Sequence, residues 1–164
     1  MKQKPSQIEV RMAGAEDASA VAAVLKRAFI EYRESYTQDG FIATVLTTDK
    51  VETHMTEGPM WVALDSEEIV GTVAAVSQGE VLYVRSMGIV PKARGKRIGE
   101  LLLKNVEAFA MAHRHKRMTL STTPFLSRAI RLYERFGFQR SDAGPADLFG
   151  TPLFTMTKKL NRSD

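Results

Sequence analysis

The chain has 164 residues, 44% of them hydrophobic, and this length and composition predict one folded domain over residues 1–164 with a core of normal size. The absence of cysteine excludes disulfides, thiolate-bound metals and a cysteine nucleophile. Lys and Arg number 23 against 19 Asp and Glu, and the resulting net charge of +4 suits an anionic partner without requiring nucleic acid.

No targeting or membrane segment is visible in the sequence. No apolar run follows the charged first residues, and none approaches the roughly 18 residues of a membrane helix. We therefore expect a cytoplasmic protein that does not enter a membrane, with flexible tails at residues 1–6 and 161–164.

The first part of the chain predicts a strand followed by helices. Apolar and polar residues alternate over 8–12, which indicates a strand. Apolar residues then recur at helical spacing over 21–32, with Gly14 as a candidate N-cap and Asp17 placing negative charge at the positive end of the helix. A short second helix is expected over 41–46.

Three strands are predicted in the middle of the chain. The apolar runs 60–64 and 69–76 flank an Asp-Ser-Glu-Glu turn and indicate a hairpin, with Trp61 in the core. Residues 80–90 are apolar on both faces, as expected of a central strand, and Gly88 indicates a bulge or a close approach of another backbone.

The last part of the chain alternates helices and strands. A strong helical stripe spans 98–110, and a strand is expected over 118–122. Pro124 suits the first position of the next helix with Thr123 as its cap, and Gly137 suits its end. A strand from residue 138, a long loop over 141–152 and a strand over 153–157 complete the order. This order predicts an α/β domain whose mixed central sheet has six to seven strands, with helices on both faces.

One stretch carries a chemical signal, because a short basic turn joins the central strand to the strong helix. The first turn of a helix has unpaired N–H groups that bind anions, phosphate above all. Gly95 and Gly99 would let the backbone approach closely. Ordinary solvated surface and a nucleic-acid patch are the alternatives. The basic residues are Lys92, Arg94, Lys96 and Arg97.

These residues also carry a family resemblance. Arg94 to Gly99 resembles the Arg/Gln-x-x-Gly-x-Gly/Ala signature of the GNAT superfamily of acetyl-CoA-dependent N-acetyltransferases. Met87 to Pro91 resembles the splayed strand before that signature, and Ala129 to Phe138 resembles the later Ala-x-x-Leu-Tyr-x-x-x-Gly-Phe segment. With the opening strand and helix, which include Val10-Arg11 and Glu16-Asp17-Ala18, the resemblance covers nearly the whole chain.

The resemblance implies a single-domain GNAT-type fold and transfer of an acetyl group from acetyl-CoA directly to a primary amine of a small molecule or peptide. Acetyl-CoA would be the co-substrate, no metal would be needed, and a homodimer is possible. By analogy, the Ile89 amide would polarise the thioester carbonyl. The residues implied to bind acetyl-CoA are Met87, Ile89, Arg94, Gly95, Lys96, Arg97, Ile98, Gly99 and Glu100.

Catalytic roles follow from the same resemblance. Tyr133 is the candidate general acid for the departing thiolate, although its place on an apolar stripe also suits a core residue. The general base is unassigned: Tyr83 lies where some relatives have Glu, and Glu80 fits a turn. Tyr32 and Tyr36 would begin the acceptor wall. Here the acceptor is the amine that would receive the acetyl group.

Two positions depart from the family pattern. Arg97 replaces a usual glycine, and we expect it to keep a helix-compatible φ. Leu126 replaces a cofactor-binding Asn, so that contact is not carried over.

Two other function classes remain open: a non-catalytic acyl-CoA-binding regulatory protein on the same scaffold, and an RNA- or ribosome-associated domain that uses the basic turn. The turn lacks the interleaved aromatic residues that stack on bases, which makes a nucleic-acid partner the weaker alternative. His54, His113 and His115 form no metal pattern, and the last two suit a structural place at a helix C-terminus.

Overall fold

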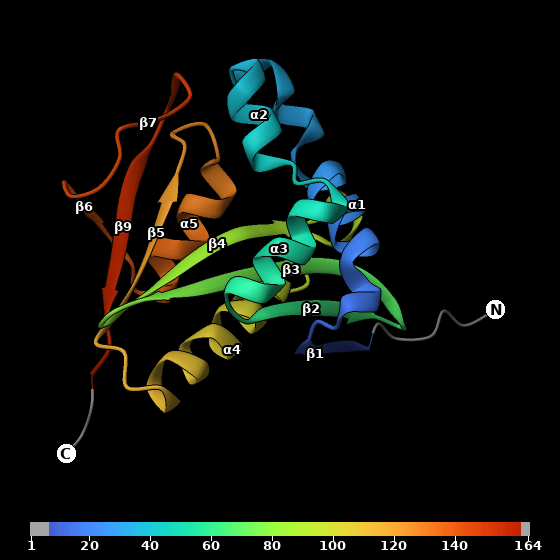
Figure 1. Ribbon diagram of the computed structural model, residues 1–164, viewed down its shortest axis with the longest axis horizontal. Coiled ribbons are helices and arrows are strands. Elements are labelled where there is room, and N and C mark those ends of the chain that lie inside the picture. Colours follow the sequence, from blue (N-terminus) through green and yellow to red (C-terminus); the bar gives the residue numbers. More distant parts are fainter. Residues whose placement is uncertain (1–6, 162–164) are drawn as a thin grey trace.

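A mixed sheet of seven strands forms the centre of the fold in the computed structural model, which describes residues 7–161 (Figure 1). The order is β1-β2-β3-β4-β5-β9-β6, and β4–β5 is the parallel pair among antiparallel neighbours. The predicted mixed sheet of six to seven strands is confirmed. Of the tails predicted at residues 1–6 and 161–164, all residues except 161 lie outside the described range. The strands are β1 (Ile8–Met12), β2 (Met60–Asp65), β3 (Glu68–Gln78), β4 (Val81–Ile89), β5 (Arg117–Thr122), β6 (Gln139–Ser141) and β9 (Phe154–Lys159).

Helices cover both faces of the sheet, as predicted (Figure 1). Side chains alternate along β2, so Met60 and Val62 pack in one buried cluster with residues of α1 and α3. Trp61 and Ala63 pack in the other cluster, with residues of α4, which confirms Trp61 as a core residue. The helices are α1 (Ala18–Phe29), α2 (Gln38–Thr44), α3 (Thr48–Glu57), α4 (Ile98–Ala112) and α5 (Ser127–Phe136), with 3₁₀ turns at Ala15–Asp17, Ile30–Ser35 and Pro91–Ala93.

The N-terminal helices differ in detail from the prediction. Tyr32 lies in the 3₁₀ turn after α1, and α2 ends before Val45 and Leu46. Helix α3 was not predicted, because its apolar residues are only Val51, which is fully buried, and Met55, which is partly buried. Thr47 caps α3 by accepting a hydrogen bond from the Lys50 N–H.

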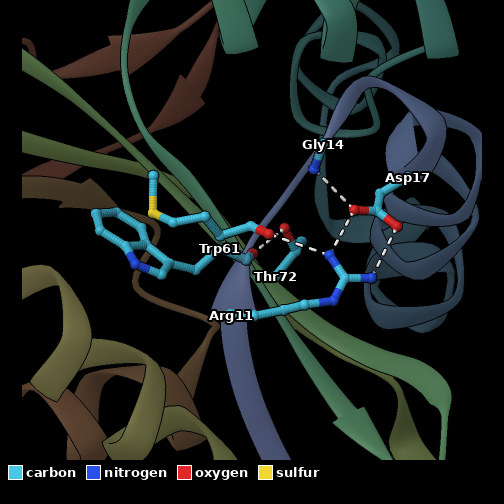
Figure 2. A network of polar contacts seen from close by, with 6 residues as sticks. Arg11, Gly14, Asp17, Trp61 and Thr72 are labelled. Carbon is cyan, nitrogen blue, oxygen red and sulfur yellow. Dashed lines mark hydrogen bonds and ion pairs between the residues drawn. The ribbon is translucent and has the colours of Figure 1, made fainter.

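The entry into α1 is fixed by the polar network that Figure 2 shows. Arg11 on β1 donates two hydrogen bonds to the Asp17 carboxylate, at 2.8 and 3.1 Å. The Gly14 N–H donates to the same carboxylate at 2.8 Å, and this pairing lowers the pKa of Asp17. Asp17 therefore holds the first strand to the first helix, in the place the sequence predicts.

The β2–β3 hairpin and the bulge in β4 follow the prediction. Ser66 and Glu67 at the hairpin turn both have positive φ, as expected of a two-residue turn. The β3–β4 register shifts between Arg85 and Gly88, and Ser86 has φ +53°. A Cβ on Gly88 would lie 3.1 Å from the Ala28 Cβ, so α1 packs closely on this strand.

Two local predictions near the C-terminus are wrong. Helix α5 begins at Ser127 rather than Pro124, because residues 123–126 form a separate turn in which the Leu126 N–H donates to the Thr123 carbonyl. Thr123 is therefore not its cap. The region predicted as a loop over 141–152 holds a small hairpin of β7 (Asp147–Leu148) and β8 (Thr151–Pro152). Gly137 ends α5 at φ +111°, as predicted.

Candidate functional site

The parallel strands β4 and β5 pair only at their beginnings. The last paired residues are Tyr83 and Thr119, although the strands continue to Ile89 and Thr122. Figure 1 shows the two halves of the sheet diverging from this point. Beyond the divergence, the backbone groups of β4 that face β5 have no strand partner.

Ile89 presents its backbone to this gap. The Val90 N–H donates to the Val70 carbonyl of β3, and Gly71 lies opposite Ile89 in the register. Because successive residues of an antiparallel strand direct their amides to alternate sides, the N–H and C=O of Ile89 point away from β3. They are therefore available to an extended ligand in the gap.

A cavity of about 1300 Å³ occupies the region of the divergence. This exceeds the roughly 300–1,000 Å³ of pockets for drug-sized ligands, so a larger ligand has room there. The residues expected to bind acetyl-CoA line it, apart from Lys96, and so does Tyr133. Tyr32, Tyr36 and Tyr83 belong to its wall as well.

The turn before α4 is held open by two left-handed residues. Gly95 has φ +86°, and Arg97, the N-cap of α4, has φ +61°. The helix-compatible φ expected for Arg97 is therefore wrong. An L residue is strained in this region, which explains physically why a glycine suits the position. Because α4 begins at Ile98, the N–H groups of Ile98, Gly99 and Glu100 have no carbonyl one turn back to bond.

The basic side chains of the turn point to different places. Lys92 pairs with Glu68 and Lys96 with Asp65, each at 2.7 Å, so both lysines reach the β2–β3 hairpin. Neither is among the residues that line the cavity. Arg94 lines it and pairs with Glu31, and its Nη2 donates to the Ala28 carbonyl at 3.2 Å.

Gly99 has a packing role in addition to its place in the turn. A Cβ there would lie 2.5 Å from the Leu132 Cδ2 of α5 and 3.3 Å from the Ile89 Cδ1. A Cβ on Gly95 would meet no non-neighbouring atom within 4 Å, so the requirement for glycine there comes from its positive φ. The two glycines serve different purposes.

Tyr133 belongs to the buried core and also lines the cavity. The residue is 8% exposed, and its ring lies 5.9 Å from that of Phe138 in an edge-on contact. Its hydroxyl donates a weak hydrogen bond to the Met87 sulfur at 3.9 Å. Burial raises the pKa of Tyr133, so the phenol keeps its proton at neutral pH.

Two groups of cavity residues were missed in the sequence. Arg128, Arg131 and Arg135 line it from one face of α5, and their i, i+3, i+7 spacing was a readable signal. His54 of α3 and Arg85 of β4 also line it. No local pattern could have joined this pair, since they come together only when α3 packs on the sheet.

The other histidines and Glu80 have the structural places expected of them. His115 is buried, and its Nε2 bonds the Ser77 hydroxyl at 2.9 Å. The His113 ring stacks on Phe109 at 3.9 Å. Glu80 is exposed and pairs with Lys116. Across residues 7–161, no group of three or more His, Asp and Glu is placed to hold a metal. No helix in the same range is both long and apolar enough to span a membrane.

Comparison with known proteins places the chain in a family. The model of the acetyltransferase (GNAT) family matches residues 21–138. An uncharacterised N-acetyltransferase of Escherichia coli K12, YjgM, is 28% identical over 132 residues, which cover 77% of this chain and 79% of that protein. The N-acetylaspartate synthetase of Danio rerio is 37% identical over 82 residues, 49% of this chain and 29% of the relative. The match thus spans less than a third of that relative's length.

The fold has close structural neighbours. The PaiA N-acetyltransferase of Thermoplasma acidophilum, solved in complex with coenzyme A, superposes with a TM-score of 0.81. The superposition covers 94% of this chain and 99% of the neighbour, at 18% sequence identity. Because the family model matches most of the chain and the folds agree, this chain belongs to the GNAT family of acetyltransferases.

Proposed function

We propose that the chain transfers an acetyl group from acetyl-CoA directly to a primary amine of a small molecule or peptide. One observation carries this proposal. A single cavity is lined by the first turn of α4, by the open edge of β4 and by the buried Tyr133. Anion-binding groups, a gap for an extended chain and a proton donor therefore border the same space.

The residues present fit acetyl-CoA. The unpaired N–H groups of Ile98, Gly99 and Glu100, with Arg97 beside them, suit the pyrophosphate. The backbone of Ile89 suits the pantetheine arm, which carries amides of its own. The arginines of α5 add positive charge along the same wall: Arg128, Arg131 and Arg135.

Acetyl-CoA would supply a thioester that an amine can attack, and the chain supplies the rest. The Ile89 N–H points into the gap and would donate a hydrogen bond to the thioester oxygen. As the N–C bond forms and the C–S bond breaks, Tyr133 would pass its Oη proton to the sulfur. The chain holds no cysteine that could form an acyl-enzyme, which agrees with direct transfer.

His54 is our candidate to receive the proton that the attacking amine loses. Among the described residues that line the cavity, His54 is the one imidazole and Glu100 the one carboxylate. Glu100 lies in the first turn of α4, at the phosphate end. Burial lowers the pKa of His54, and the nearby Arg85 lowers it further, so the imidazole is neutral at neutral pH.

The test is thiol release from acetyl-CoA in the presence of a panel of primary amines. Tyr133→Phe should lower kcat by about 100-fold, because a general acid contributes roughly that much, while acetyl-CoA affinity stays unchanged. Tyr83→Phe, which removes a hydroxyl from the same cavity, should keep most of the rate. Equal rates for wild type and Tyr133→Phe would refute the acid role of Tyr133.

Two experimental results would favour a different function over the proposed acetyl transfer. Tight acetyl-CoA binding with no thiol release on any amine would support a regulatory acyl-CoA-binding protein. Nanomolar binding of RNA that weakens steeply with salt would support a nucleic-acid partner.

A further inference from the structure

The charges that line the cavity lie in two separate places. Five of its six arginines belong to the turn before α4 and to α5, where the donor phosphates would bind: Arg94, Arg97, Arg128, Arg131 and Arg135. The sixth, Arg85, precedes the bulge of β4. Arg85 lies five positions before Val90, the residue that follows β4, which corresponds to at most about 16 Å of extended chain. Arg85 is therefore not needed to hold the pyrophosphate.

Arg85 faces the other substrate's side of the sheet. Its register partner on β3 is Ala74, which packs in the buried cluster of α1 and α3. Directly opposed residues of two strands point to the same face, so Arg85 points toward α1 and α3. The cavity wall on this side also includes Tyr36 and His54.

The guanidinium of Arg85 is only partly paired. Its Nη2 donates to Glu57 Oε1 at 2.9 Å. Its Nε is enclosed and has no hydrogen-bond partner within residues 7–161. The Arg85 side chain is 22% exposed, and a guanidinium cannot give up its charge. The neighbouring His54 Nδ1 is enclosed without a partner as well. An enclosed guanidinium N–H at a cavity wall is suited to a ligand that brings acceptor oxygens.

Glu57 shows that this guanidinium can bind a carboxylate. It is the last residue of α3, its side chain is 45% exposed, and it places a carboxylate oxygen on Arg85. An exposed ion pair of this kind contributes little, so a second carboxylate can share or replace it. A guanidinium binds a planar carboxylate through two parallel N–H groups, whereas it repels a polyamine.

We propose that the acceptor is an amine that also carries a carboxylate, and that Arg85 binds this carboxylate at the α1–α3 side of the cavity. The inference rests on the proposed acetyl transfer. It adds that Arg85 is a specificity residue, which selects amino acids over their carboxamides and over polyamines.

The test compares amino acids with their carboxamides as acceptors. Thiol release from acetyl-CoA is followed with each of these acceptors in turn. They are glycine, aspartate, glutamate and phenylalanine, the α-carboxamide of each, and putrescine. For at least one pair, kcat/KM should be tenfold or more higher for the acid. Arg85→Met should abolish this preference, because kcat/KM should fall much more for the acid than for the amide. Arg117→Met, at an exposed arginine of β5 outside the cavity, should behave as wild type.

The variant Glu57→Gln distinguishes carboxylate binding by Arg85 from a purely structural role of Arg85, because only binding predicts a change in KM. Removing the competing carboxylate should lower KM for the acid by about threefold, while kcat is unchanged. Arg85→Lys keeps the positive charge but loses the two parallel N–H groups of the guanidinium. It should therefore show a smaller preference for the acid than wild type, but a larger one than Arg85→Met. Acid and amide used equally well by wild type, or equal losses for both in Arg85→Met, would overturn the proposal.

Calorimetry of the same amino acids with CoA-saturated protein separates this proposal from the proposed function. Binding of an acid that disappears in Arg85→Met, without turnover of any amine, would support the carboxylate site and refute the acetyl transfer. Turnover of amines without any preference for acids would refute the carboxylate site alone. Neither turnover nor binding would refute both.

Discussion

Arg97 allows the conformational and electrostatic demands of the turn before α4 to be measured separately. Its φ of +61° lies in the left-handed region, which costs an L residue about 1–2 kcal/mol. Glycine avoids that cost but loses about 0.5–1 kcal/mol more chain entropy on folding. Arg97→Gly should therefore raise the free energy of unfolding by about 0.5–1 kcal/mol, which for a chain of this length raises Tm by about 1–4 °C.

The same replacement removes a positive charge from the cavity wall. Arg97 is exposed, so its attraction to a phosphate about 4 Å away is close to the value in water, about 1 kcal/mol. Acetyl-CoA should bind Arg97→Gly about fivefold more weakly at low salt. The difference should shrink at high salt, because exposed charges are screened.

Two further variants separate the effects. Arg97→Ala keeps the left-handed strain and loses the charge, so it should match wild type in Tm and Arg97→Gly in affinity. Arg97→Lys keeps both and should match wild type in both. Thermal unfolding and calorimetric titration with acetyl-CoA at two salt concentrations measure these quantities. If Arg97→Ala stabilises the chain as much as Arg97→Gly, the strain is not where the φ angle places it.

Three other predictions concern stability. Gly99→Ala should destabilise the chain by about 1–3 kcal/mol, because the new Cβ meets Leu132, and adding Leu132→Ala should recover part of the loss in urea unfolding; no recovery would mean that another contact sets the cost. Asp17→Asn should cost about 1–2 kcal/mol at neutral pH by weakening the bonds to Arg11 and Gly14. The folded pKa of Asp17 is lowered, so the cost of Asp17→Asn should begin to shrink below about pH 4 and disappear as pH falls through that lowered pKa. A cost that persists in acid would count against the ion pair. The folded pKa of His54 lies below 6.5, so the unfolded chain takes up that proton first and stability should fall as pH drops below about 6.5. His54→Gln should reduce this slope in melts across pH, and an unchanged slope would contradict the assignment.

Sequence patterns predicted those features that depend on local chemistry. The strands, the apolar stripe of α4, the hairpin turn at Ser66 and the Gly14 cap with Asp17 at N3 depend on neighbouring residues, and the structure confirms them. The basic turn could also be predicted as a candidate anion site, since the strand, the glycines and the helix follow one another directly. Helix α3 was missed because its stability comes from packing Val51 against the sheet rather than from an apolar face of its own.

What the sequence could not give was the direction of side chains across long separations. Lys96 looked like part of the phosphate site, but the β2–β3 hairpin brings Asp65 within 2.7 Å of it. Arg85 and His54 are 31 positions apart, and only the packing of α3 on β3 and β4 puts them on one wall. The φ of Arg97 was likewise hidden, because a helix N-cap admits both extended and left-handed residues.

Burial determines the protonation states of several cavity residues, and these states affect how an amine could react there. It raises the pKa of Tyr36 to about 12 and that of Tyr133 as well, and it lowers the pKa of His54, so all three are neutral at pH 7. The guanidinium groups at both ends stay charged. An ammonium that enters this region loses water and meets positive charge, and both effects favour its neutral, nucleophilic form. The cavity would thereby perform part of the deprotonation, and a weak acceptor such as His54 would be sufficient for the rest.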